Sequence, residues 1–127
     1  MSEYIVVAIN VGVANGPTMV INRALAVDAY DKFDVIVPDG STALTVELQP
    51  GGSGQVGFLL VSSDQYGNNL TYKVNDAADA YKLDGPHLLI GAGAVSLLDE
   101  APAKLVFANS LGMNAQVRIL IGRDATL

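Results

Sequence analysis

The 127-residue chain contains no cysteine, no tryptophan and a single histidine, and only 16% of its residues are charged. The absence of cysteine excludes disulfide scaffolds, cysteine-based zinc sites, iron–sulfur clusters and thiol catalysis. The single histidine excludes a zinc site that needs several histidines, and no Gly-x-Ser-x-Gly elbow supplies a serine nucleophile. We therefore predict a protein that is not an enzyme, with no catalytic, cofactor-binding or metal-binding residues.

Positive charge is also scarce. The chain has 7 basic and 13 acidic residues, so its net charge is −6, and no two basic residues are adjacent. Nucleic acids and acidic membranes bind proteins through clustered basic residues, so neither is an expected partner. Long apolar runs are missing, since the longest has about five residues and a membrane-spanning helix needs about 20. The first residues lack the basic region of a signal peptide, so we expect synthesis and folding in a cytoplasm.

What the chain has in excess is apolar residues, which make up 50% of it. Soluble domains ordinarily carry about 25% charged residues, so part of this apolar surface is expected to be covered by other chains. Four segments are apolar on both faces: Tyr4–Ile9, Phe58–Val61, Leu88–Ile90 and Ile119–Ile121. Such strands are either central in a covered sheet or part of a subunit interface. Four of them in one small domain favour a homo-oligomer.

Apolar residues alternate with polar ones at a period of two, which predicts β-strands. In 42–49, for example, Leu44, Val46 and Leu48 share one face. Turn sequences rich in glycine, asparagine and proline recur every 12 to 18 residues or so. The segments expected as strands are Tyr4–Val13, Thr18–Val27, Phe33–Val37, Thr42–Gln49, Val56–Ser62, Leu70–Asn75, His87–Ile90, Ala94–Leu98, Lys104–Ala108 and Val117–Ile121.

These elements predict an all-β fold, an antiparallel β-sandwich or jelly roll of eight to ten short strands. The length of 127 residues is that of one domain, so we expect residues 1–127 to form a single β-sandwich domain. No segment has the pattern of an amphipathic helix of three turns. Asn75–Lys82 fits either one helical turn or a loop.

Two clusters of polar residues are candidates for a metal site. Asp28, Asp31 and Asp34 offer oxygen ligands for calcium, but their context is that of a solvated bend between strands. Asp64, Asn68 and Asn69 form a polar loop without the spacing of an EF-hand. We expect neither cluster to be a specific metal site.

The glycine-rich segments and the histidine are interpreted structurally. The segment 91–94 resembles half of a dinucleotide-binding motif, but position 96 is serine, so we predict a bulge or tight bend between two strands. Pro50–Gly54 lacks the Lys-Ser/Thr of a phosphate-binding loop and is expected to be a flexible loop. His87 lies between Pro86 and Leu88 and is expected at a turn or strand edge.

Tyrosines in loop-like contexts leave a second function open. If Tyr30, Tyr66 and Tyr81 gathered at one end of the sandwich, their rings would form a platform on which a sugar could stack. Asn69-Leu70-Thr71 matches the glycosylation sequon, but it accompanies no secretion signal.

The C-terminal third of the chain carries a resemblance to a known group of proteins. It runs from Leu83–Gly91 through Phe107-Ala108-Asn109 to the ending Ile119-Leu120-Ile121-Gly122-Arg123-Asp124. This region resembles small all-β virion proteins of tailed bacteriophages, of the head-decoration or cement kind. The chain differs from some of them in lacking a long Gly/Thr-rich N-terminal arm.

The resemblance implies a non-enzymatic structural protein of a phage particle, one that decorates or stabilises the capsid through protein–protein contacts. It further implies a homotrimer, a location in the virion, and the major capsid protein or another virion protein as partner. A glycan-binding adhesin or tail-fibre-type module is the alternative, and a small β-barrel hydrolase is a third, weaker one.

Overall fold

The computed structural model describes residues 3–48, 55–98 and 102–124. Within them the chain forms ten strands and one short helical segment, which confirms the all-β prediction. The strands are β1 (Glu3–Gly12), β2 (Thr18–Val27), β3 (Ala29–Val37), β4 (Leu44–Glu47), β5 (Gln55–Ser63), β6 (Leu70–Val74), β7 (Ala80–Lys82), β8 (His87–Ile90), β9 (Lys104–Asn109) and β10 (Ala115–Asp124).

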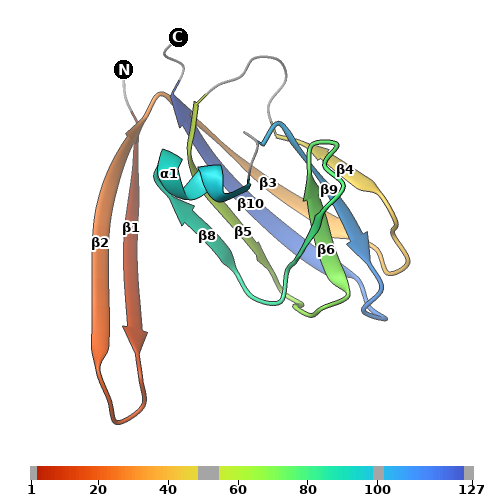
Figure 1. The fold of residues 1–127 in the computed structure, drawn as a ribbon, viewed down its shortest axis with the longest axis horizontal. Coiled ribbons are helices and arrows are strands. Elements are labelled where there is room, and N and C mark those ends of the chain that lie inside the picture. The colour runs from red at the N-terminus through yellow and green to blue at the C-terminus, as the bar shows by residue number, and fades with distance from the viewer. Residues whose placement is uncertain (1–2, 49–54, 99–101, 125–127) are drawn as a thin grey trace.

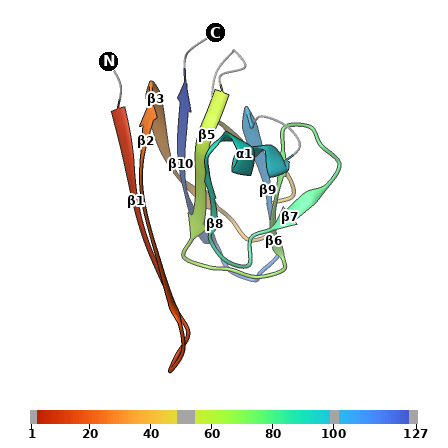
Figure 2. The same ribbon diagram turned by 60° about the vertical axis from the view of Figure 1, so that its left-hand side comes forward.

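Eight of these strands form two four-stranded antiparallel sheets that pack face to face (Figures 1 and 2). One sheet has the order β3-β10-β5-β8 and the other has the order β4-β9-β6-β7. Along the chain every connection between these strands crosses from one sheet to the other, except the hairpin from β6 to β7. This eight-stranded double-sheet order is that of a jelly roll.

The core lies between the sheets because each strand sends alternate side chains inward. In β10, Val117, Ile119 and Ile121 are buried, whereas Gln116 and Arg118 between them are exposed. From the second sheet Tyr72 and Phe107 fill the middle, with their ring centroids 5.7 Å apart. The core therefore has the period-two pattern that the sequence indicates.

One polar side chain, Asn109, is buried within this apolar interior at 1% exposure. Its amide nitrogen Nδ2 donates hydrogen bonds to the carbonyl oxygens of Val37 and Met113, both at 2.9 Å. Its Oδ1 accepts a hydrogen bond from the N–H of Leu111, also at 2.9 Å. Asn109 thereby joins the end of β3 to the turn between β9 and β10.

The two remaining strands, β1 and β2, pair only with each other among the described residues. They form a hairpin of ten residue pairs, from Glu3↔Val27 to Gly12↔Thr18. Figure 1 shows this hairpin leaving the sandwich at one end and running away from it. We call it the arm, and it lies outside the two sheets of the sandwich.

The structure corrects three sequence predictions. Ala94–Leu98 is not a strand: Ala92–Val95 forms one helical turn, α1, and Ser96–Leu98 a 3-10 turn. Gly91, with φ of 96°, forms a tight bend as expected, but the bend leads from β8 into this helical segment and not into a second strand. The spacing of buried Val95 and Leu98 is that of a helix.

The other two corrections concern strand limits. Ala80–Lys82, expected in a loop or helical turn, is the edge strand β7. The strand expected at Phe33–Val37 begins at Ala29, and only Asp28 forms the bend that precedes it.

Candidate functional site

The arm is the most exposed apolar element of the molecule. Its pairing places Ile5, Val7 and Ile9 on one face together with their partners Leu25, Arg23 and Ile21. The opposite face carries Tyr4 and Val6, which are 67% and 77% exposed. Both faces of the arm thus carry apolar side chains.

Toward its tip the first face is open to solvent. We call this part the arm stripe, and it consists of Ile9, Val11, Met19 and Ile21. Met19 is 62% exposed and Val11 is 54% exposed. The tip itself closes with backbone hydrogen bonds from Val13 N–H to Pro17 O and from Gly16 N–H to Val13 O.

At its base the arm rests on β10. A Cβ atom at Gly122 would lie 2.5 Å from Ile5 Cδ1 and 3.1 Å from Val27 Cγ1, so glycine there allows close approach. The N–H of Asp28 donates a hydrogen bond to Arg123 O at 3.0 Å, which fixes the chain where it leaves the arm for β3. The first face of the arm therefore turns toward the outer face of the β3-β10-β5-β8 sheet.

That outer face carries an aliphatic patch, which we call the sheet strip. Leu120 pairs with Leu60, and Leu60 pairs with Leu88 on the other side, so the three side chains form one row across the sheet. Ile90 lies in the next row toward the base of the arm, opposite Phe58. All four strip residues, Leu60, Leu88, Ile90 and Leu120, are only partly buried.

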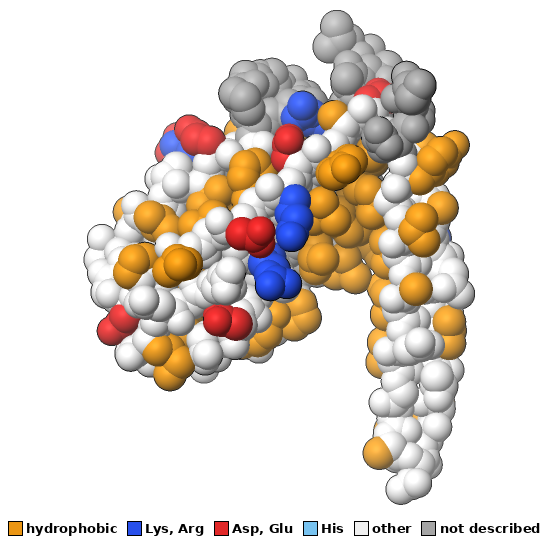
Figure 3. Space-filling view, turned by 180° about the vertical axis from the view of Figure 1, so that it is seen from behind, with side chains coloured by type: hydrophobic (Ala, Val, Ile, Leu, Met, Phe, Trp, Pro, Cys, Tyr) orange, Lys and Arg blue, Asp and Glu red, His pale blue; other side chains and the backbone are white. Residues whose placement is uncertain are grey.

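Figure 3 shows a deep cleft between the arm and the body, with hydrophobic side chains gathered on the body beside the arm. A row of basic and acidic side chains borders them. In this region Arg118 Nε lies 3.7 Å from Asp34 Oδ1, and Lys32 Nζ lies 3.6 Å from Asp34 Oδ2. These charged side chains pair with one another beside the sheet strip, and the strip itself contains no charged residue.

A hollow of about 310 Å³ lies at the base of the arm. Tyr4, Ile5 and Val6 line it from the arm, and Tyr30 and Leu120 line it from the sheet. Its lining consists of aliphatic and tyrosine side chains, which suits an apolar contact.

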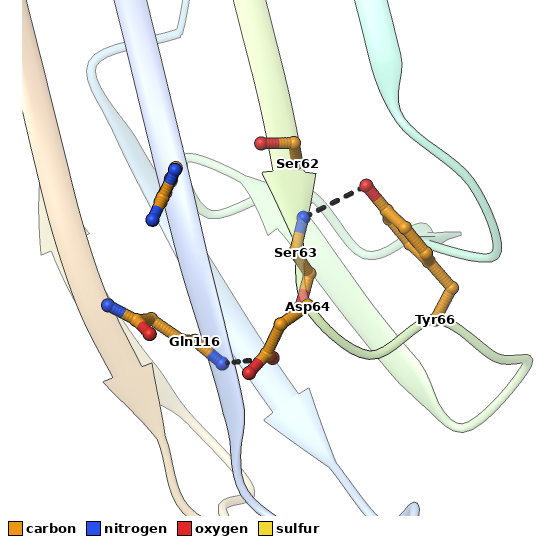
Figure 4. A pocket seen from close by; sticks show the side chains of 6 residues that line it. Ser62, Ser63, Asp64, Tyr66 and Gln116 are labelled. Carbon is orange, nitrogen blue, oxygen red and sulfur yellow. Dashed lines mark hydrogen bonds between the residues drawn. The ribbon is translucent and has the colours of Figure 1, made fainter.

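A second hollow, of about 300 Å³, is polar and lies where β5 ends (Figure 4). Asp64 Oδ1 accepts a hydrogen bond from the N–H of Gln116 at 2.8 Å, and the Tyr66 hydroxyl accepts one from the N–H of Ser63 at 3.1 Å. Arg118 completes the polar lining. Such a set of donors and acceptors suits a small polar ligand.

The three tyrosines considered as a sugar platform do not gather. Tyr30 pairs with Gly122 at one end of β10, while Tyr66 lines the polar hollow near Gln116 at the other end. Six strand residues span about 20 Å, so these two rings are far apart. Tyr81 packs on Tyr72 in the second sheet, and its hydroxyl donates to Leu98 O at 3.4 Å.

His87 begins the edge strand β8, and its ring reaches inward. Its Nδ1 lies 2.6 Å from the hydroxyl of Tyr72, with the rings edge to face and their centroids 5.5 Å apart. Burial, followed by the nearby Tyr81, raises the pKa of Tyr72 well above its ordinary value of 10.0. The two side chains share a hydrogen bond inside the sandwich, and neither residue lines one of the hollows described above.

The acidic clusters are separated by the sheet. Asp31 and Asp34 lie three apart in β3 and so point to opposite faces. Asp31 Oδ2 lies 3.8 Å from Arg123 Nη1, and Asp34 is paired as described above. Among the described residues no group of three or more histidine, cysteine or acidic side chains could hold a metal ion.

In the polar loop Asn68 and Asn69 are exposed, and Asn69 O accepts a hydrogen bond from the N–H of Ser110. The loop Pro50–Gly54 lies outside the described residues.

The arm is the candidate functional feature that the sequence indicates only in part. Its strands were expected at the right positions, and the apolar character of both faces was noted for Tyr4–Ile9. One feature of the sequence could have indicated that the two strands leave the sandwich as a separate hairpin. This feature is the low charge of residues 3–27, where Glu3 and Arg23 are the only charged residues.

Comparisons with known proteins gave no match: no protein-family model, no curated protein and no solved structure resembles the chain significantly. In the described part of the chain no helix is long and apolar enough to cross a membrane.

Proposed function

We propose that this chain is a non-enzymatic structural protein that works by joining neighbouring proteins, with the arm as the joining element. The observation that carries the proposal is the arm itself, a hairpin of two ten-residue strands that carries apolar side chains on both faces, with neither edge paired to a further strand among the described residues. A two-stranded hairpin alone is at best marginally stable in water, so an apolar one needs a surface to cover it. Exposed, uncharged strand edges also promote pairing with another chain.

The assembly that we propose is a bacteriophage particle, in which the chain decorates or stabilises the capsid as a homotrimer in contact with the major capsid protein or another virion protein. The resemblance of residues 83–124 to phage decoration proteins supports this proposal. The jelly roll supports it by analogy only, because viral capsid domains share this fold with unrelated proteins.

The test uses particles purified from the phage that encodes the chain. Mass spectrometry and immunogold labelling of intact particles are expected to find the chain on the capsid surface, and sedimentation of the free protein is expected to give three copies. Absence of the chain from purified particles would contradict the virion assignment.

A shortened variant tests the role of the arm in the same particles. Since Ala8 pairs with Asn22, replacing residues 9–21 by Asn-Gly closes the hairpin with a two-residue turn. We expect this variant to fold but to be missing from particles. Normal incorporation would show that the arm is not the joining element.

The polar hollow favours a second candidate function, the binding of a glycan. It places the ring of Tyr66 beside Asp64, Gln116 and Arg118, which is a suitable set for sugar hydroxyls. A glycan array followed by titration would test this. Binding that Tyr66→Ala abolishes and Tyr30→Ala leaves unchanged would support it, whereas absence of binding across the array would contradict it.

A further inference from the structure

Resting on the proposed joining role of the arm, we infer that its partner is a second copy of this chain. The arm of one copy enters the cleft between the arm and the sheet of the next copy. There the sheet strip covers the face of the inserted arm that carries Val6 and Val20, and the arm stripe of the receiving copy covers the arm stripe of the inserted one.

The first argument is that the arm and the cleft have complementary shapes and chemistry. An arm with apolar side chains on both faces can be covered fully only between two walls. The cleft offers two such walls, the sheet strip of Leu60, Leu88, Ile90 and Leu120 and the arm stripe of Ile9, Val11, Met19 and Ile21. A single flat surface would leave either Val6 or Met19 exposed to water.

The second argument is that the arm cannot fill its own cleft. Contact with the body is confined to the half of the arm that includes Ile5, Val27 and Val7, where Ile5 and Val27 approach Gly122 and Val7 is only 9% exposed. Beyond that point the hairpin diverges from the sheet, as Figure 1 shows. The arm forms one wall of the cleft, so the layer that fills it comes from another molecule.

Charge gives the third argument. Residues 3–27 contain one acidic residue, Glu3, and one basic residue, Arg23, so the arm is neutral. The whole net charge of −6 therefore lies on the rest of the chain. A neutral arm can approach the acidic body of another copy without electrostatic repulsion, and the sheet strip that receives it is uncharged.

Area gives the fourth argument. A hairpin of two ten-residue strands is about 34 Å long and about 10 Å wide, so each face covers about 340 Å². A stable interface buries about 800 Å² on each partner. One face of the arm supplies less than half of this. The open face together with the tip half of the other face supplies about 510 Å², and the receiving sheet strip adds to it.

Cross-linking between single-cysteine variants tests the inference, because the native chain has no cysteine to interfere. Val20→Cys places a thiol on the arm, Leu88→Cys places one on the sheet strip, and Thr45→Cys places one on the exposed side of β4 in the other sheet. The variants carry tags of different mass and are mixed in pairs under mild oxidation.

We expect the Val20→Cys and Leu88→Cys pair to form a mixed disulfide at least ten times faster than the Val20→Cys and Thr45→Cys pair. Equal rates for the two pairs would overturn the inference, because arm insertion brings only the first pair together.

A charge substitution provides the second measurement. Met19 and Leu97 are both exposed apolar residues, at 62% and 72%, but only Met19 lies on the arm. Met19→Glu is expected to weaken self-association at least tenfold in sedimentation, while Leu97→Glu leaves it unchanged. A monomeric wild-type protein at high micromolar concentration, or equal effects of the two variants, would overturn the inference.

These outcomes are distinct from failure of the proposed function. Self-association through the arm without incorporation into particles would contradict the virion role alone. Incorporation that needs the arm, from a protein that is monomeric in solution, would contradict the second copy as partner and leave the joining role intact.

Discussion

A single buried side chain, Asn109, joins the end of β3 to the turn between β9 and β10, two parts of the sandwich that are far apart in the sequence. Its three hydrogen bonds reach β3, Leu111 and Met113, and no buried polar side-chain atom among the described residues lacks a partner. The residue belongs to the Phe-Ala-Asn sequence that contributed to the resemblance noted above. Its structural role explains why an asparagine, and not an apolar residue, occupies this core position.

Asn109→Ala is expected to lower the free energy of unfolding by about 3 kcal/mol, since it leaves several buried backbone groups without partners. Asn109→Asp is expected to cost more, because a carboxylate would face the carbonyl oxygens of Val37 and Met113. Urea denaturation measures both effects. Asn68→Ala, on an exposed residue, is the control, and an equal effect there would contradict this account.

The raised pKa of Tyr72 leads us to expect that the protein loses stability at alkaline pH. Because the pKa of Tyr72 is raised in the folded protein, the folded state holds its proton at a pH where the unfolded state has released it. The resulting stability is complete below pH 10 and declines above it, by at most about 1.4 kcal/mol per pH unit. Urea denaturation between pH 8 and pH 11 measures this decline.

Tyr72→Phe should remove the part of this decline that Tyr72 causes, while costing about 1 kcal/mol at neutral pH through the lost hydrogen bond. The hydrogen bond to Asp76 raises the pKa of Lys104, which adds a decline of the same sign in every variant. Tyr30→Phe, whose ring is 54% exposed, is the control and should keep the wild-type profile. Identical profiles for the two variants would argue against burial as the cause.

Among the elements, the strands were largely predictable and the arrangement of the arm was not. Alternation identifies strands because burial on one face requires it, and nine of the expected segments are strands in the structure. The prediction of a strand at Ala94–Leu98 was wrong because the small residues of segment 92–98 show little periodicity. The helical conformation there depends on two buried residues, Val95 and Leu98. Strand pairing across long sequence distances leaves no local pattern, so the sequence could not show that β1 and β2 pair only with each other.

The base of the arm depends on the missing side chain of Gly122. Gly122→Ala is expected to lower the free energy of unfolding by about 1–3 kcal/mol, since the new Cβ would displace Ile5 and Val27. It should also speed proteolysis within residues 3–27. Gly57→Ala is the matched control, because no atom lies within 4 Å of a Cβ there. Equal stability of the two variants would mean that the arm is not held at Gly122.

For the whole molecule, the uneven distribution of charge predicts how salt affects association. Copies with a net charge of −6 repel one another, and the proposed contact itself contains no ion pair. Raising the salt concentration from 10 to 150 mM shortens the Debye length from about 30 Å to about 8 Å. Sedimentation should therefore show tighter association at the higher salt. Weaker association would indicate that ion pairs hold the copies together.

The single residue between β2 and β3 also has a mechanical consequence. A pull on the tip of the arm travels along β2, passes Asp28 and enters β3, which is paired with β10 along nine residue pairs. Figure 1 shows that β2 and β3 meet at an angle at the base of the arm, so such a load falls first on the pair Ala29↔Arg123 and then on the pairs that follow it. The arm is thus a tether whose load is carried by the pairing of β3 with β10, starting at the end nearest Asp28.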